Sequence, residues 1–487
     1  MGGYAIDSFH REDVVLIFIG LTDSKQGCKF AFNFHFPMSR NFFNIISAVF
    51  FVVIATNPAT AQYVNRLESA GFNTDKTSIY IEDLKTGEVV LDLNGELPLI
   101  PASVMKIVTA ASVLSSGDSS ARFRTRVTTN GTIENGILKG DIILYASGDP
   151  TVESAFFPST AGITDSIAEK IVSMGVNMIN GDVIISYPSW MEEPVPAGWK
   201  DTDLIRPYGT GYHAFNYADN RMAIKFPSLK TNPPVPDGTV KFLRTQKGFS
   251  INRNRTTNAI KASGRVLKRG RTEITSNPNP QASFSLKLKE TLNDRGVKIS
   301  GIKSNNAEGD ETELYINESP EIIDILRSMM HRSDNLYAEA MLNTLASGGR
   351  EKALDVEREI WANRGADIKD ISIKDGSGLS RDNKLTAYFL ADVLSWMAAN
   401  HNENNVFVNL FPLAGQEGTV KRFLSDTDLE GALVLKSGSV NDVQCYAGYR
   451  LDEMQNPSHL IVIMSNDFGC SRAALKKYLQ KLLIEKL

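Results

Sequence analysis

The chain changes character along its length, and this change constrains its fold more than any other feature. Short β-type runs broken by Gly, Pro and Asn extend from about Phe123 to Asn305, and helical patterns return after Ile322. Such runs predict strands bounded by turns, whereas apolar residues three and four apart predict amphipathic helices. The chain of 487 residues is long enough for about three domains. We therefore expect a mostly β section and a mixed section of helices and strands.

The two ends of the chain predict strands, and helices are expected between them. A hairpin is expected around the turn Lys85-Thr-Gly87, with strands at 78–84 and 88–93, and three antiparallel strands are expected at 432–438, 443–451 and 459–464. The expected helices are 163–173, 284–294, 322–330, 336–345, 385–399 and 472–487. The last helix has a Lys-rich polar face, which would suit a membrane surface, but its apolar stripe favours packing on the sheet.

Residues 38–61 have the features of a secretory signal peptide. A basic start precedes an apolar stretch from Phe42 to Ala55, and Ala59-Thr60-Ala61 matches a cleavage site. The apolar stretch is shorter than the ~20 residues of a spanning helix, which favours a removed signal over a retained anchor. We expect cleavage after Ala61, a periplasmic or secreted protein, and at most loose membrane association. Residues 1–37 would precede the signal, so we expect translation to start at Met38.

Charge and cysteine content narrow the possible partners. The chain has 52 basic and 56 acidic residues, a net charge of −4, and no long single-sign run, so no nucleic-acid partner is expected. The exported part contains Cys445 and Cys470, which would form a disulfide or remain two small buried side chains. Neither has Cys or His at metal-ligand spacing, and we expect no metal and no cofactor. The oligomeric state stays open.

A serine and a lysine at helical spacing supply a candidate nucleophile and base. Pro101 to Leu114 reads as the start of a buried helix, on which Ser103 and Lys106 would share a face. A serine hydroxyl needs an adjacent base to attack a carbonyl, and none of the six histidines lies in a recognisable triad context. Lys106 is therefore the candidate base. Ser300-Gly-Ile-Lys303 has the same spacing but reads as a strand and a turn.

Two further patterns complete a set with the first. Ser333-Asp-Asn335 lies at a break between two predicted helices, and Lys436-Ser-Gly438 lies at the end of a predicted strand. Each alone fits a helix N-cap or a strand end. Together and in this order, S-x-x-K, S-D-N and K-T-G are the signature of penicillin-binding proteins and class A β-lactamases. Here Lys-Ser-Gly replaces Lys-Thr-Gly and keeps the hydroxyl.

These residues suffice for acyl transfer. Neutral Lys106 would accept the proton of Ser103, since burial and the charge of Lys436 would lower the pKa of Lys106. Ser333 would relay a proton to the leaving amine. Asn335 offers a donor and an acceptor to a peptide amide.

The third motif would bind the charged parts of the substrate. Lys436 with Ser437 would form a site for a terminal carboxylate. The backbone N–H groups of Ser103 and of Ser439, which follows Gly438, would form an oxyanion hole, whose donors are worth ~2.7–4 kcal/mol each.

From about Asn73 to its C-terminus the chain resembles the class C low-molecular-mass penicillin-binding proteins, the D-alanyl-D-alanine carboxypeptidase/endopeptidase (DacB-type) family. Ser333 follows Ser103 by 230 residues, and this family inserts two extra domains in that gap. Longer strings carry the rest of the resemblance: Lys139–Thr151, Ala197–Asp201, Asp294–Gly301, Asp375–Arg381 and Pro412–Thr419.

The resemblance implies an α+β fold. Its catalytic domain would be penicillin-binding transpeptidase/β-lactamase-like, an antiparallel sheet flanked by helices, with two inserted, mostly β domains. After the extension and signal at 1–61, we expect the catalytic domain at 62–122 and 322–487, inserted domain II at 123–148 and 230–321, and inserted domain III at 149–229.

The resemblance also implies a serine D,D-peptidase. It would cleave D-Ala-D-Ala or D-amino-acid cross-links of peptidoglycan stem peptides through a Ser103 acyl-enzyme, and β-lactam antibiotics would acylate the same serine. Arg381 would help to bind the peptide side chain, or would cap a surface turn. Ser186-Tyr187 stands where family members often carry an acidic residue for the amine of diaminopimelate. The stem-peptide preference and the balance of carboxypeptidase and endopeptidase action therefore stay open.

Two other functions compete with this one. A serine β-lactamase would share Ser103 and Lys106, but it is a compact domain without the insertion and needs a deacylation base, which is not recognisable here. A non-catalytic cell-wall-binding scaffold would not require the intact set of motifs.

Overall fold

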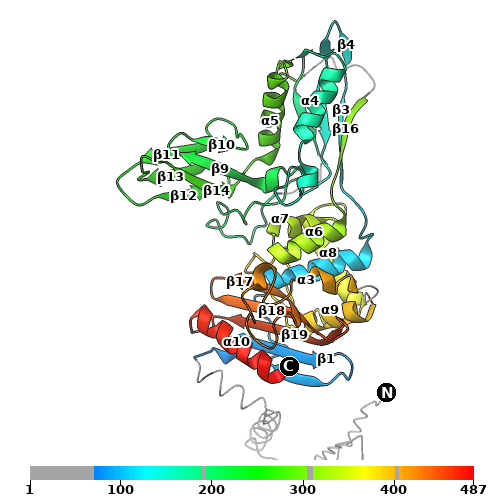
Figure 1. Ribbon diagram of the computed structural model, residues 1–487, viewed down its shortest axis with the longest axis vertical. Coiled ribbons are helices and arrows are strands. Elements are labelled where there is room, and N and C mark those ends of the chain that lie inside the picture. Colours follow the sequence, from blue (N-terminus) through cyan, green and yellow to red (C-terminus); the bar gives the residue numbers. More distant parts are fainter. Residues whose placement is uncertain (1–67, 69–70, 188–192, 304–310, 401–404) are drawn as a thin grey trace, which may run out of the picture. The chain divides into compact units, whose positions relative to one another are not determined.

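The computed structural model describes residues 68, 71–187, 193–303, 311–400 and 405–487 (Figure 1). The expected extension and signal peptide, 1–61, lie outside these residues. The described residues form one compact unit. Among the described helices, none combines the length and the apolar character needed to cross a bilayer.

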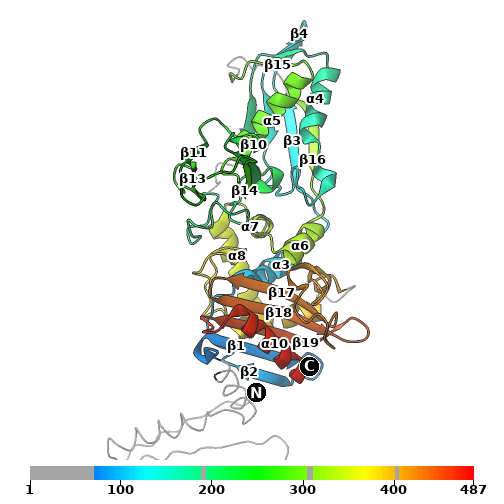
Figure 2. The ribbon, with the colours of Figure 1, turned by 60° about the vertical axis from the view of Figure 1, so that its left-hand side comes forward.

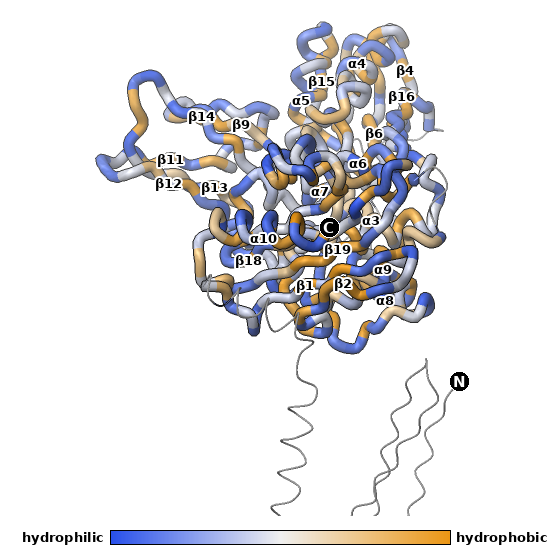
Figure 3. The backbone as a smooth tube through the Cα atoms, turned by 60° about the horizontal axis from the view of Figure 1, so that its bottom comes forward, coloured by the Kyte–Doolittle hydropathy of each residue, from blue (hydrophilic) through white to orange (hydrophobic). Residues whose placement is uncertain are grey.

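Both ends of the described chain meet in one five-stranded antiparallel sheet (Figures 1 and 2). Its order is β17-β18-β19-β1-β2, and β1 pairs with β19 so that Ile79 lies opposite Ile463. The expected hairpin and the three C-terminal strands are thereby confirmed, and Figure 3 shows the apolar character of the central strands. The bounds are β1 Thr77–Asp83, β2 Val89–Leu93, β17 Leu433–Val440, β18 Val443–Leu451 and β19 Pro457–Asn466.

Helices pack on both faces of this sheet. One face carries α3 Met105–Ser116, α6 Ile322–Arg332, α7 Asn335–Asn343, α8 Arg350–Asn363 and α9 Ala387–Asn400. The opposite face carries α10 Arg472–Lys486, as expected from its apolar stripe (Figures 1 and 2). Alternate residues of β18, Cys445, Ala447 and Tyr449, join the first group of helices in one buried cluster. Cys445 and Cys470 are both free thiols, so the disulfide alternative does not hold.

Several elements differ in detail from the expectations. Ser103 lies in a 3-10 turn, η2 (Ala102–Val104), directly before α3 rather than inside an α-helix. Helix α8 was not expected, because its eight polar and charged residues dilute the apolar stripe that ends at Trp361. Other short 3-10 helices are η1 Thr74–Lys76, η3 Pro158–Thr160, η4 Ala218–Asn220, η6 Val408–Leu410 and η7 Gly418–Val420.

The first part of the insertion contains two four-stranded sheets and two helices that share a core. The sheet orders are β16-β3-β6-β8 and β15-β7-β5-β4. Helix α4 (Ile163–Ser173) has the expected bounds, whereas α5 (Pro280–Asp294) begins earlier because Asn279 caps it and Pro280 fits its first turn. The strands are β3 Arg124–Thr129, β4 Thr132–Glu134, β5 Ile137–Lys139, β6 Ile142–Tyr145, β7 Met178–Ile179, β8 Val183–Ser186, β15 Lys298–Ile299 and β16 Thr312–Glu318.

The second part of the insertion is formed by two three-stranded sheets around a separate small core. The sheet orders are β10-β9-β14 and β11-β13-β12. The strands are β9 Arg221–Phe226, β10 Lys230–Asn232, β11 Val240–Arg244, β12 Ser250–Arg253, β13 Ile260–Gly264 and β14 Arg271–Ser276.

This pairing does not coincide with the expected boundaries inside the insertion. Strand β6, before residue 149, pairs with β8 after it, and β9, before residue 230, pairs with β14 after it. A boundary cannot separate strands that share one hydrogen-bonded ladder. We propose instead that 123–217 and 277–318 form inserted domain II and that 221–276 form inserted domain III.

Candidate active site

A cavity of about 390 Å³ brings together residues that are far apart in the sequence. Five of the residues singled out above line it: Ser103, Ser333, Asn335, Arg381 and Ser439. Lys106 and Lys436 have no exposed surface, and both contact the lining serines. The three motifs therefore meet at one place, although they lie on η2 and α3, on the α6–α7 junction, and on β17.

Lys106 is held by three oxygen atoms. Its Nζ lies 3.1 Å from Ser103 Oγ and donates to Asn335 Oδ1 at 2.7 Å and to the Ser377 carbonyl at 2.6 Å. Burial lowers the pKa of Lys106 to about 8, against the opposing effect of nearby carboxylates, of which Asp375 is the strongest. A lysine with this pKa is partly neutral near neutral pH and can accept a proton from Ser103.

The second motif forms the junction of two helices, as its sequence predicts. Ser333 ends α6 in the left-handed conformation, with φ 57°, which turns the chain sharply. Asp334 caps α7 by accepting from the Leu336 N–H at 3.0 Å. Asn335 is the first residue of α7, so its side chain reaches the cavity on one side and Lys106 on the other.

Lys436 lies in β17 and faces the second motif. Its Nζ donates to Ser333 Oγ at 2.8 Å and to the Ser437 carbonyl at 2.7 Å. Burial and then the charge of Lys106 hold the pKa of Lys436 well below its ordinary value. Ser437 does not line the cavity, and its Oγ donates to Thr419 Oγ1 at 2.7 Å.

Gly438 allows β17 to pack directly against η2. A Cβ at this position would lie 2.7 Å from the Pro101 carbonyl oxygen and 3.0 Å from the Ser103 nitrogen. Real Cβ atoms rarely approach the backbone so closely, so only glycine fits here without a shift. The backbone of Ser439, the next residue, is thereby placed beside Ser103 at the cavity wall.

Sequence reasoning missed several residues of the cavity. Arg472, the first residue of α10, lines the cavity, donates to Ser439 Oγ, and donates to the Val440 carbonyl at 2.7 Å. Lys200, Asp203 and Tyr208 of the insertion line it as well. Lys200 lies in the string Ala197–Asp201, but no pattern marks any of these residues as part of the site, and only the three-dimensional structure brings them there.

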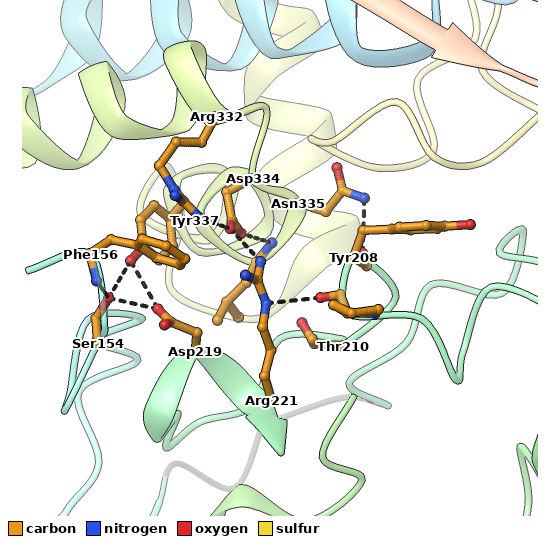
Figure 4. Close-up of polar contacts among 12 residues, drawn as sticks. Ser154, Phe156, Tyr208, Thr210, Asp219, Arg221, Arg332, Asp334, Asn335 and Tyr337 are labelled. Carbon is orange, nitrogen blue, oxygen red and sulfur yellow. Dashed lines mark hydrogen bonds and ion pairs between the residues drawn. The ribbon is translucent and has the colours of Figure 1, made fainter. Parts of the chain in front are cut away.

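The insertion contacts the second motif through charged groups (Figure 4). The Arg221 guanidinium lies 2.8 Å from Asp334, whose side chain is only 3% exposed. Arg332 lies 3.7 Å from the same carboxylate and stacks over the ring of Phe156. The Asn335 side chain donates to the Tyr208 carbonyl at 3.0 Å. Residues on both sides of the Ser333 turn are therefore held by the insertion.

A buried carboxyl group, that of Glu339, fixes the Ser377 peptide to which Lys106 donates. Glu339 lies one turn after Asn335 on α7 and accepts from the Ser377 N–H at 3.0 Å, while the Ser377 carbonyl accepts from Lys106. Burial raises the pKa of Glu339 to about 7, and Arg350 lies 3.6 Å away as its cation. Helix α7 thus contacts Lys106 twice, directly and through the Ser377 peptide.

The described residues contain no group of His, Cys, Asp or Glu that could hold a metal ion.

Comparisons with known proteins relate this fold and cavity to others. The family model described as the D-Ala-D-Ala carboxypeptidase 3 (S13) family matches residues 60–481. The chain is 23% identical over 399 residues to the D-alanyl-D-alanine carboxypeptidase DacB of Haemophilus influenzae, covering 76% of this chain and 81% of that protein. It is 24% identical over 419 residues to a D-alanyl-D-alanine carboxypeptidase of an Actinomadura species, covering 79% and 76%.

The fold matches that of solved structures. The crystal structure of penicillin binding protein 4 (dacB) from H. influenzae superposes with a TM-score of 0.72 at 21% identity, covering 87% of this chain and 98% of that chain. The same protein complexed with a β-lactam superposes with a TM-score of 0.67 at 20% identity, with the same coverage. The α+β penicillin-binding fold expected from the sequence is confirmed.

Proposed function

The chain belongs to the D-Ala-D-Ala carboxypeptidase 3 (S13) family and is a serine-type D,D-peptidase, and from this premise we propose the residues that cleave peptidoglycan stem peptides. Cleavage proceeds through an acyl-enzyme on Ser103. The observation that carries the proposal is the contact of 3.1 Å between Ser103 Oγ and a fully buried lysine amine. The cleaved bond is the terminal D-Ala-D-Ala bond or a D-amino-acid cross-link.

Acylation begins with proton transfer from Ser103 Oγ to the neutral Lys106 amine. The Oγ then attacks the carbonyl carbon of the penultimate D-Ala. The N–H groups of Ser103 and Ser439 stabilise the oxyanion, since the close packing at Gly438 places their backbones side by side. Asn335 holds the substrate amide in line with the nucleophile.

The peptide C–N bond breaks as the leaving amine takes up a proton. Ser333 Oγ delivers that proton and is resupplied by Lys436, which lies 2.8 Å from it. The proton that Lys106 took from Ser103 passes to Lys436, which leaves Lys106 neutral and Lys436 protonated again. Water then replaces the amine, gives a proton to Lys106 and attacks the ester carbonyl. The C–O bond to Ser103 breaks, and the serine recovers its proton.

The terminal carboxylate of the substrate binds at the Ser439 end of the cavity. Arg472 supplies a guanidinium beside the Ser439 hydroxyl, and Arg381 lines the same wall and donates to the Asn441 carbonyl at 2.5 Å. Ser437 and Lys436 support this site from the strand, with the ammonium of Lys436 directed to Ser333. We also propose that Arg381 helps to bind the side chain of the stem peptide, since it lines the cavity.

β-Lactam antibiotics acylate the same serine. A β-lactam complex of the H. influenzae protein of similar fold supports this proposal. The relatives are D-alanyl-D-alanine carboxypeptidases by name, and together with the expected signal peptide they support a periplasmic or secreted location.

Labelling with a fluorescent penicillin tests the proposal. The protein should be labelled stoichiometrically, and Ser103→Ala should abolish both labelling and the release of D-Ala from a D-Ala-D-Ala peptide. Ser300→Ala, in the second Ser-x-x-Lys sequence, is the matched control and should label normally, since Ser300 Oγ donates to the Gly181 carbonyl within the insertion. Equal labelling of Ser103→Ala would refute the mechanism. Rapid penicillin turnover without peptide cleavage would favour a β-lactamase.

A further inference from the structure

Inserted domain III is strongly basic in a chain that is acidic overall. Residues 221–276 contain 13 Lys or Arg and 2 Asp or Glu. The whole chain contains 52 Lys or Arg and 56 Asp or Glu. Within 240–271 there are ten basic residues and no acidic one. Neutral residues separate these charges along the sequence, so they form no long run. The fold gathers them into one small domain, where they produce a local positive field.

The strand register places basic residues next to each other. Strands β11 and β13 run parallel, with Lys241 opposite Lys261 and Leu243 opposite Ser263. The intervening Phe242 and Ala262 face the core, so the two lysines and Leu243 share the outer face. Like charges opposite each other in a sheet are destabilising. A face with this arrangement gains stability when it binds an anionic partner.

A hollow of about 710 Å³ at the end of the same strands is also basic. Arg244, Arg265 and Lys268 line it, together with Leu267. Among the described residues, none of these three cations nor Lys241 or Lys261 forms an ion pair. The end loops of these strands are hydrophilic (Figure 3).

Two large apolar side chains are exposed among these cations. Leu243 is 67% exposed and Leu267 is 52% exposed. A soluble polyanion is recognised by charge alone, whereas a membrane surface accepts cations at its headgroups and leucines at its acyl boundary. The combination of both within one small domain therefore favours a lipid surface.

Helix α10, the other Lys-rich element, lacks this combination. Its leucines Leu475, Leu479, Leu482 and Leu483 are buried. Ile484, at 41% exposed, is the one large apolar side chain that this helix exposes among the described residues, so no exposed apolar pair accompanies its lysines.

We propose that inserted domain III binds the surface of a bilayer containing anionic phospholipids. The binding face, here called the basic face, consists of Lys241, Leu243, Arg244, Lys261, Arg265, Leu267 and Lys268. Phospholipid phosphates bind the cations, and the two leucines enter the boundary between headgroups and acyl chains. This association is independent of the catalytic mechanism and keeps the enzyme at a membrane surface.

Vesicle co-sedimentation of the full chain tests the proposal. The protein should sediment with vesicles of phosphatidylglycerol and phosphatidylethanolamine, but not with phosphatidylcholine vesicles, and high salt should weaken binding. Replacing Arg244, Arg265 and Lys268 by Ser should lower the partition coefficient about tenfold or more, because each cation near an anionic surface contributes to binding. The double variant Leu243→Ser, Leu267→Ser keeps every charge, and its partition coefficient should still fall several-fold.

A triple variant with the same charge change serves as control. Replacing the exposed Lys85, Lys369 and Lys477 by Ser should change the partition coefficient less than about twofold. Unchanged melting temperatures establish that each variant is folded. Equal losses in both triple variants would overturn the proposal, because net charge alone would then explain binding. Loss of binding to purified peptidoglycan, with vesicle binding retained, would assign the basic face to a wall polymer instead.

Discussion

At the scale of single residues, Lys106 depends on its surroundings for its chemical role. An exposed lysine is protonated at neutral pH, whereas burial lowers the pKa of Lys106 to about 8. The sequence predicted the pairing of Lys106 with Ser103, since the spacing places them on one turn. It did not predict Glu339 or Arg472, because an isolated acidic or basic residue on a helix carries no pattern that distinguishes it from a surface charge.

The rate of acylation should therefore rise with pH. The pKa of Lys106 is lowered, so the amine is protonated and inactive below about 8 and becomes a base above it. Stopped-flow measurement of penicillin acylation across this range should show an ascending limb with its midpoint near 8. Lys106→Arg, which retains a cation that does not deprotonate, should lower the rate by about 10²–10⁴-fold. A pH-independent rate would contradict the role of Lys106.

Glu339→Gln should shift that limb to lower pH. The amide oxygen still accepts from the Ser377 N–H, but the negative charge that favours protonated Lys106 is lost. Asp375 and Asp334, the other carboxylates acting on Lys106, remain, as does Arg350. The midpoint of the acylation profile should move down by a measurable fraction of a pH unit.

Glu357→Gln is the matched control for this shift. Glu357 is equally buried on α8, but it is not among the charges that act on Lys106. Its acylation midpoint should stay at the wild-type value. An identical shift of the acylation midpoint in both variants would mean that the charge of Glu339 has no specific effect on the pKa of Lys106.

At the scale of elements, the sequence predicted most of the architecture that carries the site. The hairpin, the three C-terminal strands and the break at Ser333 follow from period-two patterns and from a helix-capping Asp334. The domain boundaries inside the insertion did not follow, because strand pairing between β6 and β8 depends on partners distant in sequence. Short strands of similar composition do not reveal which of them pair.

Gly438→Ala should impair the site without unfolding the sheet. The new Cβ would meet the Pro101 carbonyl and the Ser103 nitrogen, so β17 must move away from η2. Misplacing the Ser439 N–H would remove one of the two proposed oxyanion donors, and acylation should slow by about 10²–10³-fold. Penicillin labelling kinetics would measure the loss of acylation, and the melting temperature would measure any loss of stability. A near-normal acylation rate would contradict this role of the close contact at Gly438.

Arg221→Ala should weaken the contact between the insertion and the Ser333 turn. Among the described residues, Asp334 would keep Arg332, at 3.7 Å, as its ion-pair partner. Because Arg221 is 24% exposed, we expect a loss of about 1–3 kcal/mol in the free energy of unfolding, less than for a fully buried pair. Acylation should slow as well, since Ser333 and Asn335 flank Asp334. Arg295→Ala removes exposed ion pairs on the same insertion, and it should change neither the free energy of unfolding nor the rate of acylation.

At the scale of the whole molecule, buried carboxyls make stability depend on pH. Burial raises the pKa of Glu357 to about 8. The unfolded chain loses this proton near its ordinary value of 4.5, while the folded chain keeps it to about 8, so the group destabilises the fold increasingly between these values.

Glu357→Gln removes this titration. Its free energy of unfolding relative to wild type should increase with pH across that window, by up to about 1.4 kcal/mol per pH unit. Urea unfolding at several pH values would measure it. A difference that stays constant with pH would show that Glu357 is ionised in the folded protein.

The sheet that joins both ends of the chain sets the order of events during synthesis. Strand β1 pairs with β19, and the third motif lies on β17, so Ser103, the proposed nucleophile, emerges from the ribosome long before its proposed partners. The hairpin β1–β2 has a free edge until the last part of the chain appears. Nascent and truncated chains therefore have no assembled active site, and hydrolysis becomes possible only once the complete polypeptide has folded.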